Sequence, residues 1–195
     1  DLCGHATIGS FCALQQEGLV SVSKSYLAET LAGELEISVE GGFVMMDMAT
    51  PKSLGVIQEE EALKELYGVM GIPESAGKVS LEGGEWDLYP EIISTGLPDI
   101  ILPVRDVKDL ARIKPDFPAL TKLSNDYNVV GVHAFALGEG LIGDNCCEGA
   151  CEADQVTAYC RNFGPAVGID EEAATGTANG ALTYYFYKNA LIDEG

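Results

Sequence analysis

A short motif of small residues occurs twice in this chain of 195 residues, once near each end. Cys3-Gly4-His5-Ala6 aligns with Thr175-Gly176-Thr177-Ala178, and each copy opens a stretch with the spacing of a helix, residues 7–16 and 177–191. Two similar helix starts at corresponding places predict a duplicated α+β fold, with two lobes that close around a central cleft. The turn residues at 94–98 place the boundary between an N-terminal lobe, 1–93, and a C-terminal lobe, 94–195.

The hydrophobic pattern predicts the remaining elements. Residues 33–40 and 43–49 alternate apolar and polar side chains around Gly41-Gly42, which predicts a hairpin. Residues 59–69 have the spacing of an amphipathic helix. In the C-terminal lobe we expect strands at 100–104, 129–137 and 156–163 and helices at 107–112 and 119–125.

The charge of the chain limits its partners. Eleven basic and 31 acidic residues give a formal net charge of −20, so nucleic acids and anionic membrane surfaces would be repelled. No apolar run approaches the roughly 20 residues that a membrane-spanning helix needs. With no targeting signal visible, we expect a cytoplasmic protein, and the first residue, Asp1, suggests that the start of the protein is missing.

Six cysteines are too few for a fold built on disulfides, and they indicate a reducing compartment. Cys146, Cys147 and Cys151 form a cluster, but it has neither a CxxC pair nor a histidine to complete a tetrahedral site. We therefore predict a loop of reduced thiols and no metal centre.

The two helix starts are candidate anion sites. Free backbone N–H groups and the positive end of the helix dipole at Gly4-His5-Ala6 and at Gly176-Thr177-Ala178 can hold a carboxylate or a developing oxyanion without a cluster of arginines. The alternative is that the glycines only permit close packing.

Three side chains beside these helix starts have two interpretations each. His5 is either an acid–base or hydrogen-bonding group or a structural histidine, and His133, within an apolar strand, is expected to be structural. Cys3 is either a proton-transfer base or a small buried side chain. Glu172 either completes a charged first turn or binds a substrate amine or hydroxyl within the cleft.

Residues 138–143 match the dinucleotide-binding pattern GxGxxG, but the context differs from that of a nucleotide site. The residues that follow do not have a helical pattern, and Glu139 would face the pyrophosphate. We therefore do not predict nucleotide binding.

Four motifs in series resemble those of the phenazine-biosynthesis PhzF-like family, which is related to diaminopimelate epimerase and proline racemase. They lie at 1–7 (DLCGHAT), 94–98 (STGLP), 161–165 (RNFGP) and 171–180 (EEAATGTANG). The resemblance implies two lobes, each a curved sheet or barrel around a central helix, here incomplete, and a homodimer. It also implies proton transfer between substrate carbons without a cofactor. By motif position, His5, Glu172 and Thr177 match the family's histidine, aspartate and serine.

The chain departs from the family pattern in four respects. The family's catalytic glutamate belongs to a motif that we expect upstream of residue 1, and the family continues beyond the last helix. Glu172 stands where the family has an aspartate, so the substrate is expected to differ. Cys3 occupies one position of the racemases' thiol pair, but Thr175 occupies the other, and a threonine hydroxyl is too weak an acid to replace a thiol.

These observations predict a cofactor-independent isomerase that moves a proton on a small anionic, carboxylate-bearing metabolite. His5, Glu172 and Thr177 are the candidate catalytic residues, and Cys3, Gly4, Ala6, Thr175 and Gly176 would line the substrate. The alternatives are a thiol-dependent epimerase or racemase and a non-catalytic binding protein. The activity of the chain by itself stays open.

Overall fold

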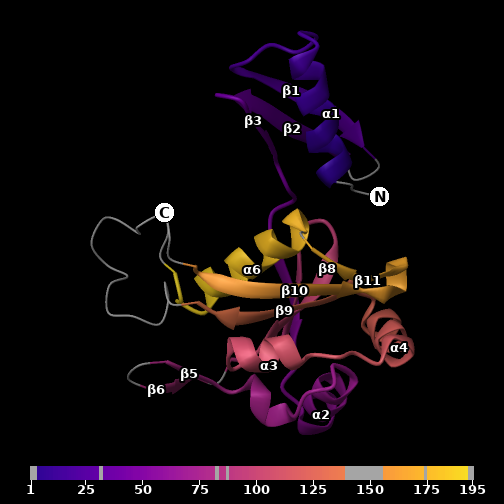
Figure 1. Cartoon of the computed structure of the whole chain (residues 1–195), viewed down its shortest axis with the longest axis vertical. Coiled ribbons are helices and arrows are strands. Elements are labelled where there is room, and N and C mark those ends of the chain that lie inside the picture. Colours follow the sequence, from indigo (N-terminus) through magenta and orange to yellow (C-terminus); the bar gives the residue numbers. More distant parts are fainter. Residues whose placement is uncertain are drawn as a thin grey trace.

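The computed structural model describes residues 4–30, 33–81, 84–86, 88–138, 156–173 and 175–192. Its helices and strands follow in chain order (Figure 1): α1 Gly4–Gln16, β1 Lys24–Thr30, β2 Gly33–Glu40, β3 Phe43–Met46, β4 Lys52–Val56, α2 Glu60–Val69, η1 Glu74–Gly77, β5 Val79–Leu81, β6 Gly84–Trp86, β7 Glu91–Ser94, β8 Pro98–Pro103, α3 Val107–Arg112, α4 Phe117–Tyr127, β9 Gly131–Leu137, β10 Ala158–Gly164, η2 Pro165–Val167, β11 Ile169–Glu172 and α6 Gly176–Lys188. The α+β class is confirmed, and the described sheets are open rather than closed barrels.

The first part of the chain forms a three-stranded antiparallel sheet, β1-β2-β3, beside α1. The predicted hairpin is confirmed as β2 and β3, in which Glu40 pairs with Phe43 across the two glycines. The buried side chains of β2, Leu35, Ile37 and Val39, alternate with exposed or half-buried ones, as expected for a sheet with one covered face. The start of α1 contacts this sheet through Gly4, where an added Cβ would lie 3.6 Å from the Cε of Met46.

The second sheet has six strands in the order β11-β10-β9-β8-β7-β4. Only β8 and β9 are parallel, and the chain between them contains α3 and α4. The predicted lobe boundary at 94 falls inside this sheet, because β7 and β8 pair antiparallel across the turn at residues 95–97. The change from one sheet to the other instead occurs between β3 and β4, so residues 52–94 share a sheet with the residues that follow them.

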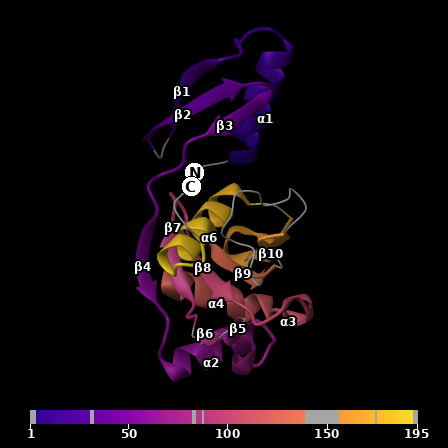
Figure 2. The same ribbon diagram turned by 90° about the vertical axis from the view of Figure 1, so that its left-hand side faces the viewer.

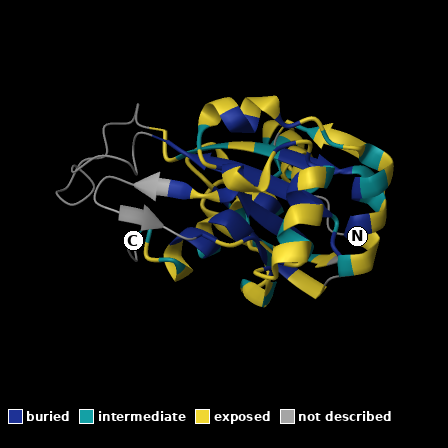
Figure 3. Cartoon of the chain, turned by 90° about the horizontal axis from the view of Figure 1, so that it is seen from below, coloured by how far each residue is buried: buried dark blue, intermediate teal, exposed yellow. Residues whose placement is uncertain are grey.

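Helices cover both faces of the six-stranded sheet (Figures 1 and 2). One hydrophobic cluster joins the sheet to α2, α3 and α4 through side chains such as Leu66, Leu110 and Leu120. The other joins it to α6 through Ala181, Leu182, Tyr185 and Phe186. All seven residues of β9 are buried because this strand is central and covered on both faces, and Figure 3 shows the buried residues gathered between the layers.

Arg161 on β10 links three elements on the face that α3 covers. Its guanidinium donates to both carboxylate oxygens of Glu171 on β11, at 2.7 and 2.9 Å. It also donates to the carbonyl oxygens of Leu110 and Ile113 at the end of α3, at 3.1 and 2.9 Å. Free carbonyls at the end of a helix need such donors, so Arg161 both caps α3 and holds β11 in place.

We predict that Arg161→Lys lowers the free energy of unfolding by roughly 1–3 kcal/mol, because an ammonium cannot reproduce the planar fork that bonds Glu171 and two carbonyls at once. Urea denaturation followed by circular dichroism measures the change. The control is Lys122→Ala, which removes an ion pair with Asp126 between side chains that are 75% and 58% exposed. The control should cost less than about 1 kcal/mol, and an equal loss in both variants would contradict the prediction.

Candidate active site between two helix starts

The beginnings of α1 and α6 face each other. Figures 1 and 2 both place the lower end of α1, which starts at Gly4, opposite the upper end of α6, which starts at Gly176. The contact is made by His5, whose Nδ1 lies 3.7 Å from Oε1 of Glu172 at the end of β11. The structure therefore brings together the two halves of the motif that the sequence paired.

His5 and Glu172 are accessible from solvent in this arrangement, with side chains that are 64% and 34% exposed. Their separation of 3.7 Å is longer than a direct hydrogen bond, so each keeps hydrogen-bonding capacity for a third group. Ala6 is exposed and Gly4 is half-buried on the first turn of α1. Cys3 lies outside the described residues.

The start of α6 is formed by Thr175, Gly176 and Thr177. Thr175 occupies the N-cap position with an extended backbone, φ −131° and ψ 108°, but its side chain makes no capping hydrogen bond. The Thr175 hydroxyl therefore accepts no hydrogen bond from the backbone N–H groups of the first turn. Thr95, in the turn between β7 and β8, donates to the carbonyl of Thr177 at 2.9 Å and fixes the helix end to the sheet.

Glu91 is buried on the α6 face of the sheet, where it pairs with Lys188. Four further buried polar side chains lie on this face toward the start of α6: Thr95, Asp99, His133 and Asn162. Cross-strand pairs share a face, and Ile93 pairs with Asp99, Ile101 with His133, and His133 with Asn162. Ile93 and Ile101 pack against α6, so the polar members of these pairs point to the same side.

Two hydrogen bonds join this buried group to the helix start. His133 Nδ1 lies 3.1 Å from Oδ1 of Asn162, and Asn162 Nδ2 donates to Oγ1 of Thr175 at 3.0 Å. Burial lowers the pKa of His133, against the opposing effect of the Asn162 and Asn179 amides, so its imidazole is neutral at pH 7. The expected structural location of His133 agrees with its 2% exposure.

Asp99 is the buried acid of this group. Burial raises its pKa from an ordinary 3.8 to about 7, although a hydrogen bond from the backbone of Gly131 acts in the opposite direction. Asp99 therefore binds a proton at a higher pH than an ordinary aspartate does, and its strand position places it on the sheet face that α6 covers.

Sequence reasoning missed the roles of Thr95, Asp99 and Asn162. Thr95 and Asn162 belong to the motifs at 94–98 and 161–165, which indicate the family but not the role of either side chain. Asp99 could have been found as a charged residue directly before the apolar run at 100–102. The link from His133 to Thr175 crosses three separate segments and has no signature in local spacing.

Other predicted features lie partly outside the described residues. The cluster of Cys146, Cys147 and Cys151 lies entirely outside them, as does all of the GxGxxG segment except Gly138. Within the described ranges, no group of three or more histidine, cysteine or acidic side chains is arranged to hold a metal ion. In the same ranges, no helix combines the length and the apolar character needed to cross a lipid bilayer.

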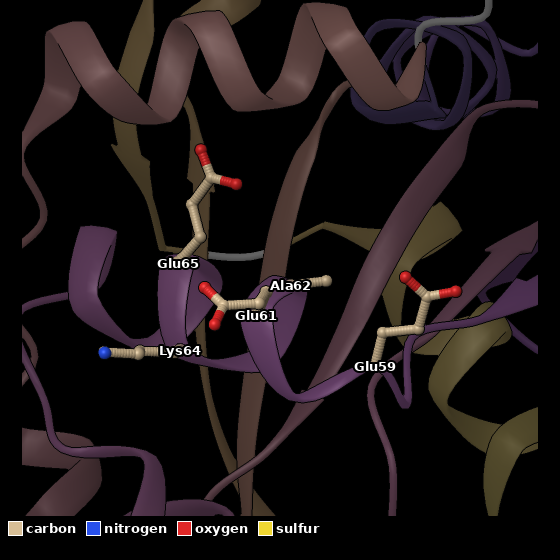
Figure 4. A pocket seen from close by; sticks show the side chains of 5 residues that line it. All are labelled: Glu59, Glu61, Ala62, Lys64 and Glu65. Carbon is tan, nitrogen blue, oxygen red and sulfur yellow. The ribbon is translucent and has the colours of Figure 1, made fainter.

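A separate hollow of about 550 Å³ lies beside α2, away from the helix starts (Figures 1 and 4). It is lined by Glu59, Glu61, Ala62, Lys64 and Glu65. Three carboxylates against one ammonium disfavour an anion here, so this hollow does not compete with the helix starts for an anionic ligand.

The model of one protein family, described as phenazine biosynthesis-like protein, matches residues 1–194. The chain belongs to the PhzC-PhzF family. An uncharacterized isomerase of Clostridium acetobutylicum is 28% identical to it over 97% of the chain. An uncharacterized isomerase of Deinococcus radiodurans is 31% identical over 93% of the chain. The chain spans 57% and 53% of the lengths of these two relatives.

Solved structures have the same fold. A PhzF family protein of Bacillus anthracis superimposes with a TM-score of 0.71 at 25% identity, over 95% of this chain and 57% of that one. A hydroxyproline epimerase of Agrobacterium vitis, at 15% identity, has a TM-score of 0.50 over 97% of this chain and 52% of that one. The likeness to the epimerase fold, which the sequence motifs predicted, is thus confirmed.

We predict that Asp99→Asn changes the pH dependence of stability. Because the folded-state pKa of Asp99 lies above its ordinary value, the folded protein binds the extra proton, and stability is lost as the pH rises from about 4 to about 7. The asparagine variant lacks this loss, so its free energy of unfolding should rise relative to wild type by up to roughly 1.4 kcal/mol per pH unit across that window.

Urea denaturation between pH 4 and pH 8 measures this difference. Asp170→Asn, which removes an exposed carboxylate on β11, is the control and should run parallel to wild type. An Asp99→Asn curve that is also parallel would contradict the assigned pKa.

Proposed function

We propose that this PhzC-PhzF family protein is a cofactor-independent isomerase that moves a carbon-bound proton on a small carboxylate-bearing molecule. The observation that carries the proposal is the approach of two helix starts, with His5 and Glu172 between them. Relatives that are named isomerases support the reaction class.

The two helix starts supply the positive potential that an anionic substrate needs. The chain has a formal net charge of −20, so its surface repels anions in general. The positive dipole ends of α1 and α6 and the N–H groups of their first turns create a local exception. Gly4, Ala6, Gly176 and Thr175 would form the backbone side of this site.

The side chains suit a substrate with a second polar group. Glu172 would hold an amine or hydroxyl of the substrate, while His5 and Thr177 orient the carboxylate and stabilise charge that develops on it. The distance of 3.7 Å between His5 Nδ1 and Glu172 Oε1 favours these separate roles, because the two side chains do not use up each other's hydrogen-bonding capacity.

A two-thiol epimerase mechanism is less well supported. The N-cap of α6 is Thr175, whose Oγ1 accepts a hydrogen bond from the Asn162 amide. A hydroxyl with a pKa far above neutrality does not serve as the second acid–base group of a thiol pair. A mechanism with one base agrees better with this residue.

The general base stays a prediction. The family resemblance assigns it to a glutamate in the motif that precedes the DLCGHAT segment, and the full-length sequence tests this directly. The homodimer and the cytoplasmic location also stay predictions.

The proposal is tested by solvent-deuterium exchange. The full-length protein is incubated in D₂O with a panel of small hydroxy and amino acids, among them trans-4-hydroxy-L-proline, the compound bound to the fold relative from Agrobacterium vitis. Mass spectrometry then detects deuterium at carbon. We expect exchange with at least one acid, and Glu172→Gln and His5→Ala should each slow it by about 10²-fold or more.

Asp170→Asn is the matched control, because Asp170 is exposed and lies two residues before Glu172 on the same strand. It should exchange at the wild-type rate. Tight binding of an acid without exchange would overturn the proposal in favour of a binding protein. Exchange that is abolished by thiol alkylation of Cys3 but unaffected by Glu172→Gln would favour the thiol mechanism.

A further inference from the structure

Helices α3, α4 and α6 begin with residues that can cap a helix, but only two of them are capped. The Asp106 carboxylate accepts from the backbone N–H of Asp109 at 2.8 Å at the start of α3. The Asp116 carboxylate accepts from the N–H of Ala119 at 3.1 Å at the start of α4. Thr175 has the extended backbone of an N-cap and a suitable hydroxyl, and yet it makes no such bond.

The hydroxyl of Thr175 is engaged elsewhere. Asn162 donates to its Oγ1 from Nδ2 at 3.0 Å. This bond requires that Oδ1 of Asn162 face His133, at 3.1 Å from Nδ1, so Nδ1 carries the proton and donates. The result is a directed chain of hydrogen bonds from His133 to Asn162 to Thr175.

The backbone of Thr175 is fixed as well. Its carbonyl accepts from the backbone N–H of Asn179 at 3.1 Å and from the Nδ2 of Asn179 at 2.9 Å. Nε2 of His133 makes no hydrogen bond of good geometry with the described residues, although His133 is only 2% exposed and the Asn179 amide lies close enough to raise its pKa. A buried ring nitrogen without a partner is unfavourable for folding, so the position of His133 needs another explanation.

We propose that His133 and Asn162 are positioning residues that turn the Thr175 hydroxyl away from its own helix and so keep the first N–H groups of α6 open for an anion. The inference rests on the proposed function only in the choice of a carboxylate as the ligand. The donors are the N–H groups of Gly176, Thr177 and Ala178, which precede the bond from the Asn179 N–H to the Thr175 carbonyl and have no intrahelical partner. In a capped helix one of them would already be bonded to the threonine oxygen.

The test is an NMR titration of the ¹⁵N-labelled protein with sodium acetate, with sodium chloride as the salt control. In wild type the amide signals of Gly176, Thr177 and Ala178 should shift with acetate. In Asn162→Ala the released hydroxyl can cap the helix, so the apparent affinity should fall about fivefold or more. Adding Thr175→Val to Asn162→Ala removes the competing oxygen and should restore part of the affinity.

This rescue separates positioning from simple damage to the fold. A structural defect in Asn162→Ala would be kept or increased by a second substitution, whereas a competing cap is removed by it. A double variant that binds acetate no better than Asn162→Ala would overturn the proposal, as would wild-type amides of α6 that do not respond to acetate.

A second pair of variants tests His133 and carries the test if Asn162→Ala does not fold. His133→Asn places an amide donor near the position of Nδ1 and should keep the wild-type response, whereas His133→Leu cannot donate and should lose affinity as Asn162→Ala does. Ser124→Ala is the control, because Ser124 is also buried, its hydroxyl has no hydrogen-bond partner among the described residues, and it belongs to α4. Equal behaviour of the asparagine and leucine variants would contradict the inference.

The titration is independent of turnover. Acetate binding that follows the predicted order of variants, without deuterium exchange on any acid, would support the positioning role and reject the isomerase. Deuterium exchange on an acid, together with α6 amide signals that do not shift with acetate, would support the isomerase and reject the positioning role.

Discussion

Successive side chains of β10 point to opposite faces of the six-stranded sheet, so this one strand makes the contacts that support the candidate site on both faces. Arg161 points to the face covered by α3 and holds Glu171, while its neighbour Asn162 points to the face covered by α6 and holds Thr175. In the register of the sheet, Asn162 pairs with His133 on β9 and with Glu172 on β11. This register determines which side chains of β10 face α3 and which face α6. A slip of one residue would exchange the two faces and bring a guanidinium beneath the start of α6.

Buried polar groups are concentrated where the chemistry is proposed, and burying them lowers the free energy that this part of the core contributes to folding. Thr95, Asp99, His133 and Asn162 replace apolar side chains that the same sheet uses farther along, where Ile101 and Phe135 pack against Tyr185 and Phe186 of α6. Apolar contacts hold the body of the helix, and hydrogen bonds orient its first turn. The division allows the helix start to carry unpaired N–H groups while the rest of the helix remains firmly packed.

Much of the fold could be predicted from periodicity, and what was missed has physical reasons. The helices at 59–69 and 107–112 and the strand at 129–137 have strong patterns because their buried faces are continuous. β4 contains Lys52, Ser53 and Gly55, and β7 begins with the buried Glu91, so neither has the alternation of an ordinary strand. Glu91 is buried because Lys188 from α6 pairs with it at 2.5 Å, a partner that lies 97 residues away in sequence. Without these two strands, the sequence pattern predicts a sheet that begins after residue 94, whereas β4 and β7 belong to the same six-stranded sheet as β8.

The site was predictable at the level of backbone and not at the level of side-chain networks. The glycine motifs identified both helix starts because a helix start needs only local sequence, and His5 and Glu172 followed from their positions in those motifs. Whether a helix start is free to bind a ligand depends instead on where the N-cap hydroxyl points. At Thr175 that direction is set by Asn162, thirteen residues away, and by His133 on the next strand. The same threonine on an isolated helix would be interpreted as a cap, and only the tertiary hydrogen bonds turn it into an opening for an anion.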